Sequence, residues 1–365
     1  MLHIEIQVTQ GLLLRFQRSL QSDCKNHLVM CYRFFIGIDV SKDYLDAGLL
    51  DGDSVGIVHH HKVSNSDAGI TELLGWLEHH QDFTLEHSLF CLEHTGMYNF
   101  ALLQFFSKHS ANVWVENPIE IKRSLGVQRG KNDKVDAKRI AQYAFRMQDK
   151  ARLWQPVREV TEKLRHLASL RERLVETKKK LLTPVEELSK VGNEVMAKML
   201  SRSMNKTIKG LDKDLDAIEK QMKDIIDSDD DLKKLYALVS SVVGIGFVTA
   251  VNLIITTSEF KLFQCHRKFA CYAGVAPFEH KSGSSIRGRT KVSHMANKKI
   301  KCNLHMASLT AIKYDEGMKA YYERKVAEGK NKMSILNAIR NKLLSRIFAV
   351  VERGTIYQKN YLAVS

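Results

Sequence analysis

An apolar residue recurs at alternating intervals of four and three positions along two long stretches of this chain, and this pattern constrains the fold most. The first stretch runs from Val160 to Leu188 and the second from Met204 to Ile225. Such spacing is typical of helices that pack along one shared seam. The break near Gly192 predicts an antiparallel coiled-coil hairpin, and Pro184 is expected to kink or split its first helix.

The residues before this hairpin follow a different pattern, in which short apolar strands come first and then alternate with helices. The first three strands are close enough in sequence to form an antiparallel meander. This order is typical of an α/β domain with a mixed sheet. The pattern predicts strands at 34–40, 44–50, 54–63, 88–93 and 112–115, and helices at 66–80, 98–109 and 136–146.

The residues from Leu238 onward predict a second compact region made mostly of helices. Helices are expected at 265–272, 298–313, 319–328 and 334–352, with a Gly-, Ser- and Arg-rich loop at 280–294. The fold class is therefore α/β plus α. We divide the chain into an N-terminal extension at 1–32, a mixed-sheet domain at 33–156, a coiled coil at 157–236 and a small helical domain at 237–355.

The charge of the chain favours a polyanionic partner. Its 365 residues include 56 Lys and Arg against 41 Asp and Glu, a formal net charge of +15. An excess of this size indicates nucleic acid or, less often, an anionic membrane surface. No run of about 18 apolar residues occurs, so no membrane span is predicted.

The six cysteines do not form a disulfide framework or a CxxC pair, which fits a reducing, cytoplasmic location. Cys302 and His305 have the spacing of metal ligands on a helix. No second pair of ligands lies nearby, so we interpret them as a buried core cysteine and a surface histidine.

Four acidic residues predict a metal-binding site. Asp39 and Glu93 end two apolar strands, where a buried carboxylate is costly unless it is paired or binds metal. Asp133 and Asp136 are three residues apart where a helix begins, so they share one face. Singly, Asp39 could face solvent, Glu93 could pair with a lysine and Asp133 could be an N-cap. Together they predict the carboxylates of an RNase H-like nuclease, whose oxygen ligands hold Mg²⁺ or Mn²⁺ at a phosphate.

Basic residues surround the second acidic pair and are candidates for nucleic-acid contacts. The alternative is a set of surface ion pairs. The candidates in this region are Lys131, Lys134, Lys138 and Arg139.

Two motifs in the C-terminal region suggest phosphate contacts. Gly244 and Gly246 form a GxG turn typical of a helix-hairpin-helix element, although a plain turn between helices is equally compatible. Ser282 precedes a glycine in a loop rich in cations that could stabilise charge on a phosphate attacked by the serine. The alternative is a flexible turn whose hydroxyls only contact phosphate. The cations of this loop are Lys281, Arg287, Arg289 and Lys291.

These motifs, in this order over residues 33 to 350, resemble those of the DEDD-type insertion-sequence transposases and the related Piv invertases. The matching segments are GIDVSKDYLDA (37–47), LEHTGMYN (92–99), KNDKVDAKRIAQYA (131–144), VVGIGFVTA (242–250) and YAGVAPFEHKSGSSIRGR (272–289). The resemblance implies a RuvC-like domain, a coiled coil and a helical transposase domain. Its four acids fall on Asp39, Glu93, Asp133 and Asp136, and its serine on Ser282, with Ser284 and Ser285 close by.

The expected function is therefore DNA transposition or site-specific recombination through metal-bound carboxylates and a 5′-phosphoserine-type intermediate. The resemblance also implies donor and target double-stranded DNA, a structured guide RNA and a homodimer or homotetramer. Two departures stand out: Asn132 replaces a usual threonine, and Ala296-Asn297-Lys298-Lys299 replaces a Gly-Asn-Arg pattern. One alternative is a metal-dependent nuclease or Holliday junction resolvase without a covalent intermediate. Another is a non-catalytic coiled-coil DNA-binding protein.

Overall fold

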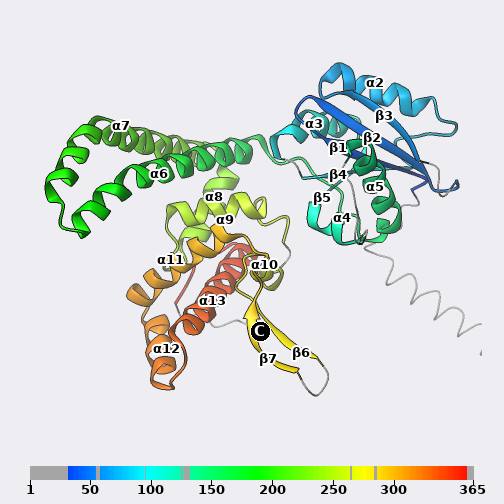
Figure 1. Cartoon of the computed structure of the whole chain (residues 1–365). Coiled ribbons are helices and arrows are strands. Elements are labelled where there is room, and N and C mark those ends of the chain that lie inside the picture. Colours follow the sequence, from blue (N-terminus) through cyan, green and yellow to red (C-terminus); the bar gives the residue numbers. More distant parts are fainter. Residues whose placement is uncertain are drawn as a thin grey trace, which may run out of the picture. The chain divides into compact units, whose positions relative to one another are not determined.

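The structure, a computed structural model, divides into two compact units at Pro156, and each is described here by itself (Figure 1). It describes residues 32–54, 58–94, 96–124, 126, 132–263, 265–282 and 286–359, with only the backbone for 280–282, 286, 287 and 289. Our division into four domains stays a prediction at this level of detail.

The first unit is built on one mixed sheet of five strands in the order β3-β2-β1-β4-β5. Strand β1 pairs antiparallel with β2, and β2 pairs antiparallel with β3, which confirms the predicted meander. Strand β4 lies parallel to β1, and β5 parallel to β4. The strands are β1 (Phe34–Val40), β2 (Tyr44–Asp51), β3 (Val58–Ser64), β4 (Ser88–Glu93) and β5 (Asn112–Glu116).

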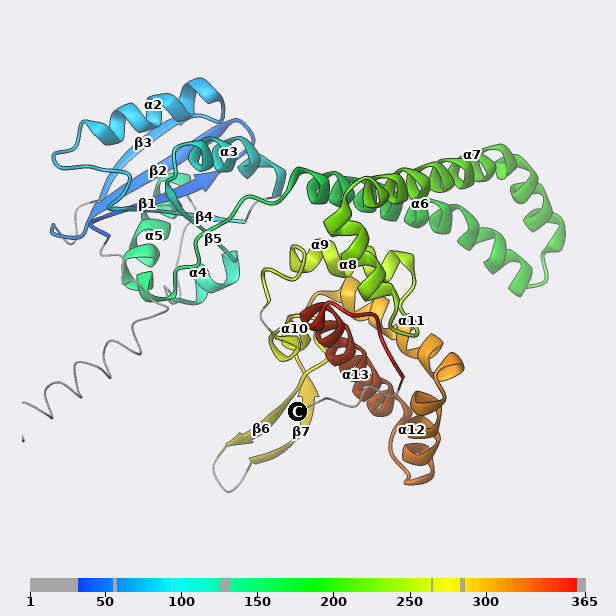
Figure 2. The same ribbon diagram turned by 180° about the vertical axis from the view of Figure 1, so that it is seen from behind.

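Alternation along the strands gives the sheet two different buried faces. One packs against α2 (Asp67–Glu78) and α3 (Phe100–Lys108), and the other against α5 (Asp133–Arg146). Figures 1 and 2 show these helices on opposite sides of the sheet. A short 3-10 helix, Gly96–Asn99, precedes α3, and α4 (Pro118–Ser124) precedes α5. This arrangement is consistent with an RNase H-like domain.

A pair of glycines lets α5 lie directly on the sheet. Gly37 of β1 and Gly48 of β2 stand opposite each other in register. A Cβ on Gly37 would lie 2.1 Å from the Ala141 amide nitrogen, and one on Gly48 would lie 3.1 Å from the carbonyl of Ala137. Because glycine has no Cβ, the helix backbone approaches closely at this point. The pair therefore fixes the position of α5 over β1 and β2.

The second unit begins with two long helices, α6 (Glu159–Lys190) and α7 (Glu194–Asp227), which pack against each other. Gly192, with a φ of +82°, lies in the turn between them. Helix α6 continues through Pro184, so this proline does not split the helix, and the kink that was the other expectation stays a prediction. Coiled-coil packing along the whole hairpin stays a prediction, since the side chains buried in the core lie near its base. They include Leu164, Ala168, Ile218 and Met222.

That base shares one apolar core with the C-terminal helices. These are α8 (Asp230–Ser240), α9 (Phe247–Thr257), α10 (His266–Tyr272), α11 (Lys298–Tyr314), α12 (Glu316–Ala327) and α13 (Lys332–Arg353). Within the described residues, no helix is long and apolar enough to cross a membrane.

Two expectations for this region are wrong. Residues 280–294 were expected to be a loop, but β6 (Pro277–Ser282) and β7 (Ile286–Val292) form an antiparallel hairpin. The Gly-Ser composition concealed apolar and β-branched residues at alternate positions of β7. Cys302 was expected in the core, yet it is exposed.

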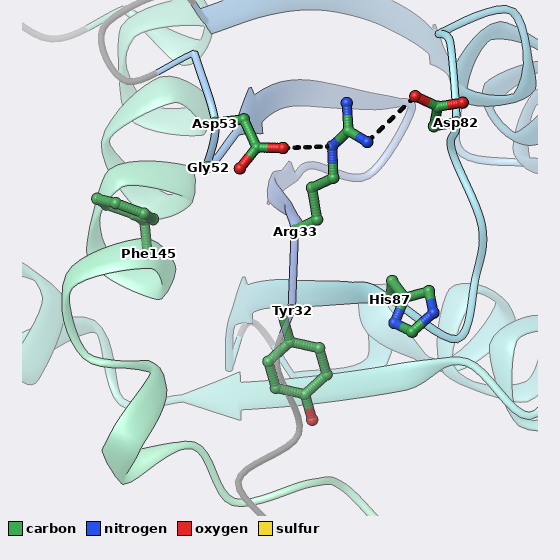
Figure 3. A pocket seen from close by; sticks show the side chains of 7 residues that line it. All are labelled: Tyr32, Arg33, Gly52, Asp53, Asp82, His87 and Phe145. Atoms are coloured by element: carbon green, nitrogen blue, oxygen red, sulfur yellow. Dashed lines mark hydrogen bonds and ion pairs between the residues drawn. The ribbon is translucent and has the colours of Figure 1, made fainter.

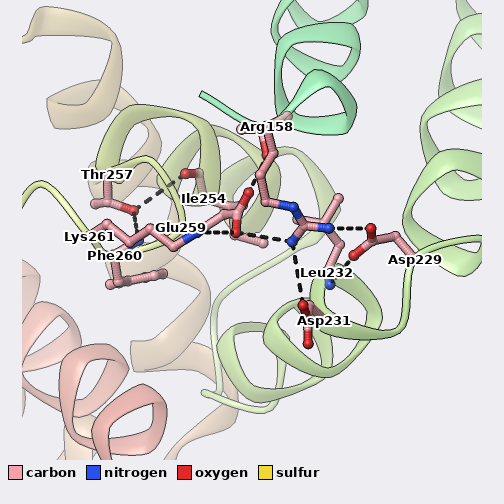
Figure 4. A network of polar contacts seen from close by, with 10 residues as sticks. Arg158, Asp229, Asp231, Leu232, Ile254, Thr257, Glu259, Phe260 and Lys261 are labelled. Atoms are coloured by element: carbon pink, nitrogen blue, oxygen red, sulfur yellow. Dashed lines mark hydrogen bonds and ion pairs between the residues drawn. The ribbon is translucent and has the colours of Figure 1, made fainter. Parts of the chain in front are cut away.

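A network around Arg158 fixes the start of α6 to two other helices (Figure 4). The Arg158 guanidinium contacts Asp229, which is the N-cap of α8, and lies 3.2 Å from Glu259 after α9. Asp231 and Lys261 join the same network. Three successive residues, 258–260, have positive φ values of 48°, 58° and 63°, which is costly for residues other than glycine. The network therefore holds a strained turn against the base of the hairpin.

Candidate carboxylate site

Three acidic residues end the three parallel strands of the first unit. Asp39 follows Ile38, which is in register with Leu92, so Glu93 is the next residue on the neighbouring strand. Glu93 is in turn opposite Glu116 at the end of β5. Cys91, two residues before Glu93, packs on the face covered by α5, so alternation directs Glu93 to that face. Gly37 also faces α5, so Asp39, two residues later on β1, points to the same face of the sheet.

The first turn of α5 supplies the other two predicted acids. Asn132 caps this helix by accepting from the Lys134 amide at 3.0 Å, so the interpretation of Asp133 as an N-cap is wrong. Asp133 is the first helical residue and is exposed, whereas Asp136 is partly buried. Because Ala137 lies over Gly37 and Gly48, the preceding turn of α5 lies close to Asp39.

The four acids influence one another electrostatically. The pKa of Asp39 is raised from 3.8 to about 6, first by burial and then by the charges of Asp133, Asp136 and Glu93. Asp46 adds a smaller effect of the same sign. Carboxylates that repel one another in this way are stabilised by a cation placed between them.

The donor set fits a hard divalent cation such as Mg²⁺ or Mn²⁺, since all four side chains offer carboxylate oxygens. Within the described residues, however, no three acidic, His or Cys side chains are close enough to hold a metal as they stand. One reason is that Asp136 accepts from Arg139 at 2.8 Å. The acids are therefore gathered by the fold but are not arranged in a coordination sphere.

Two further acids face the same side of the sheet and were missed by the sequence analysis. Asp46 stands opposite Asp39 in register, is only 5% exposed, and lies 2.8 Å from His60 Nε2. Glu116 accepts from the Tyr143 hydroxyl at 3.2 Å, and its charge, after burial, raises the pKa of that tyrosine. The sequence contained a signal for Asp46, because this acid interrupts an apolar strand in the same way as Asp39 does.

The predicted basic residues have different environments. Arg139 pairs with Asp136, so the ion-pair alternative holds for this residue. Lys134 is exposed and Lys138 half-buried, and neither forms an ion pair within the described part of the chain. Lys131 lies outside the described residues.

The predicted serine belongs to the second unit. Ser282 is the last residue of β6 and is in register with Ile286, and Lys281 is in register with Arg287. The side chains of Ser282, Lys281, Arg287 and Arg289 lie outside the described part of the structure, whereas Lys291 on β7 is exposed.

The GxG turn has one glycine with a packing role. Gly244 has a φ of +100°, and a Cβ there would lie 2.6 Å from the carbonyl oxygen of Ala307 in α11. Gly246 is the N-cap of α9 and faces open space. Contact of this turn with DNA stays a prediction for both residues.

A pocket at the other end of β1 is unrelated to the acids. Arg33, just before β1, pairs there with Asp53 at 3.1 Å and Asp82 at 3.2 Å (Figure 3). Asp39 lies near the opposite end of the same strand. The pocket is lined by Tyr32, Arg33, Gly52, Asp53, Asp82, His87 and Phe145.

Comparison with known families decides the identity of the chain. A family model described as a transposase matches residues 36–188, which include all four acids. A model of the transposase IS116/IS110/IS902 family matches residues 236–323, which include the GxG turn and Ser282. The chain belongs to this transposase family.

Related proteins support the same assignment for this transposase. It is 27% identical to the pilin gene-inverting proteins of Moraxella lacunata and Moraxella bovis, over 89% of its own length and 98% of theirs. It is also 28% identical to an uncharacterized 43.6 kDa protein of the insertion element IS110 from Streptomyces coelicolor, over 39% of this chain and 34% of that protein. The transposase is therefore an enzyme of DNA recombination.

Proposed function

We propose that this transposase cuts and rejoins DNA with Asp39, Glu93, Asp133 and Asp136 as ligands of Mg²⁺ or Mn²⁺ and Ser282 as the nucleophile. The observation that carries the proposal is that the strand register and the Gly37–α5 contact direct Asp39, Glu93 and the first turn of α5 to one face of the sheet. Burial, and then the charges of the other three acids, raise the pKa of Asp39 to about 6. Bound between these carboxylates, the cation would supply Lewis-acid stabilisation of charge on the scissile phosphate.

In the proposed reaction the Ser282 hydroxyl attacks the phosphorus, and its proton passes to a base or to water. The new serine–phosphate bond replaces the bond to the leaving 3′ oxygen, which departs as a hydroxyl and leaves a 5′-phosphoserine. A hydroxyl of another DNA strand then attacks the same phosphorus and releases the serine. Two phosphoester exchanges conserve the number of ester bonds, so no nucleotide hydrolysis is needed.

The gene inversion named for the Moraxella relatives also requires cutting and rejoining of DNA, which supports this proposal. We further propose donor and target double-stranded DNA as substrates, a structured guide RNA, a homodimer or homotetramer, and action in the bacterial cytoplasm. The net charge of +15 supports nucleic-acid partners.

One observation favours a second candidate, a metal-dependent nuclease or junction resolvase. All four acids belong to the first unit, so activation of water there would need no side chain from the second. In that case Ser282 only contacts phosphate.

The test is a denaturing gel of wild type and Ser282→Ala incubated with Mg²⁺ and DNA labelled at the cut. We expect a covalent protein–DNA adduct with wild type and neither adduct nor strand exchange with Ser282→Ala. Ser284→Ala and Ser285→Ala are matched controls that retain the adduct. Cleavage that persists without an adduct in Ser282→Ala would favour the nuclease.

A further inference from the structure

Arg340 on α13 is a buried cation that forms no ion pair with a carboxylate in the described part of the chain. The residue is only 5% exposed, and its Nε has no hydrogen-bond partner among the described residues. No ion pair of Arg340 is found within the described residues, whereas Arg346, six residues later, lies 2.6 Å from Asp315. A buried charge is normally paired, because removing a charge from water is unfavourable. Arg340 therefore carries a positive charge that nothing in this part of the structure neutralises.

The contact that Arg340 does make is with His305 on α11. An Arg340 terminal nitrogen lies 2.6 Å from His305 Nδ1. A guanidinium can only donate, so Nδ1 accepts and the imidazole is neutral, with its proton on Nε2. Burial and Arg340 lower the pKa of His305, which favours the same form. Nδ1 is therefore unavailable as a metal ligand, which argues against a metal site made by His305 and Cys302. The other ring nitrogen, Nε2, carries the proton and can donate a hydrogen bond from this half-buried ring.

The surroundings of this pair are basic. Helix α11 contains four lysines and no acidic residue, and α13 has one acid, Glu352, near its far end. Two more buried side-chain atoms without partners, on Asn303 and Asn341, lie on the same two helices.

The pair also lies close to the hairpin that carries Ser282. Asn337, one turn before Arg340, donates to the carbonyl of Val275 at 2.7 Å, two residues before β6 begins. Near the start of α11, the Asn297 side chain lies 3.0 Å from the Tyr272 hydroxyl. Helices α11 and α13 thus hold the base of the hairpin.

We propose that His305 and Arg340 form a binding site for a backbone phosphate of DNA. His305 Nε2–H donates to a phosphate oxygen, and Arg340 supplies the positive charge directly behind the ring. The inference rests on the action of this transposase on DNA but not on the serine or the metal.

The test measures equilibrium binding of the full chain to a fluorescent DNA duplex in EDTA over a range of salt concentrations. Cleavage is not needed, so the result is independent of the proposed mechanism. Arg340→Met should weaken binding about tenfold and lower the slope of log binding constant against log salt by about one, because the charge that neutralises one phosphate is lost. Its melting temperature should equal or exceed that of wild type. His305→Ala should weaken binding less, and the double variant no more than Arg340→Met.

Arg346→Met is the matched control on the same helix. It breaks an internal ion pair, so it should lower the melting temperature and leave the salt slope unchanged. Should Arg340→Met behave like this control, Arg340 is a packing residue and the proposal fails. An RNA duplex of equal length forms a second arm, and a loss confined to RNA would also overturn the DNA site.

Discussion

The acids around Asp39 and those around Arg158 lie in opposite electrostatic environments. In the first unit, burial raises the pKa of Asp39, and repulsion by Asp133, Asp136 and Glu93 raises it further. In the second, hydrogen bonds that include those from Arg158 and Lys261 lower the pKa values of Asp229 and Glu259. Both groups contain several carboxylates. In the first, Asp136 pairs with Arg139, but Asp39 has no cationic partner among the described residues. In the second, Arg158 and Lys261 pair with the carboxylates that they contact.

This difference supports the proposal that the first group binds a cation, whereas the second is a structural network. A fold that gathers like charges is less stable until a cation arrives, and such strain is typical of functional sites. A paired network instead holds elements together, as Arg158 joins α6, α8 and the turn after α9. Substitutions among the acids around Asp39 should therefore lower activity and raise stability. Substitutions around Arg158 should lower stability and change activity far less.

The largest expected effect is on catalysis. Asp39→Asn should lower DNA cleavage in Mg²⁺ by about 10³-fold, because it removes a charged ligand at the centre of the acids. Arg158→Met should reduce cleavage far less at a temperature where it is folded. Single-turnover cleavage of a labelled duplex measures both, and equal losses would remove the distinction between the two groups.

The next effect is on stability. Arg158→Met should lower the free energy of unfolding by about 2 kcal/mol at pH 7.5, since it leaves the mostly buried Glu259 without its guanidinium partner. A carboxyl group whose pKa is lowered by folding stabilises the fold at pH values above its ordinary pKa. It loses that effect as the pH falls through the lowered pKa. The deficit of Arg158→Met should thus shrink in acid. Arg165→Met, which removes a partly exposed pair with Glu162 on the same helix, is the control and should cost under about 0.5 kcal/mol.

The smallest effect has the opposite sign. The folded pKa of Asp39, about 6, is above its ordinary value of 3.8, so its contribution to stability falls as pH rises from about 4 to 6. Asp39→Asn should therefore raise the free energy of unfolding by about 1 kcal/mol at pH 7.5 without metal, after allowance for solvent screening. The gain should vanish near pH 4, and Mg²⁺ should raise the melting temperature of wild type only. Denaturant titrations of wild type and Asp39→Asn at both pH values measure this difference in stability. An Asp39→Asn variant less stable than wild type at pH 7.5 would contradict the prediction.

Much of the fold followed from local pattern. Most strands and helices of the first unit matched the expected positions, because periods of two and 3.6 residues report which face is buried. Helix α4 was not expected, and β3 begins at Val58 rather than at residue 54. Helix α5 began three residues earlier than expected, since the cap is Asn132. The β6–β7 hairpin was missed because its turn-rich composition outweighed a weak alternation.

The sequence by itself determined which residue types were out of place: acids at the ends of apolar strands, a net charge of +15 and a serine before glycine among cations. Only the tertiary structure decided which of them meet. Strand register placed Asp46 opposite Asp39, and the Gly37–Gly48 contact brought the first turn of α5 to the strand ends. Among the described residues, the packing of α11 on α13 gave Arg340 no carboxylate partner. These outcomes depend on distances between segments far apart in the chain, which no local pattern of residues encodes.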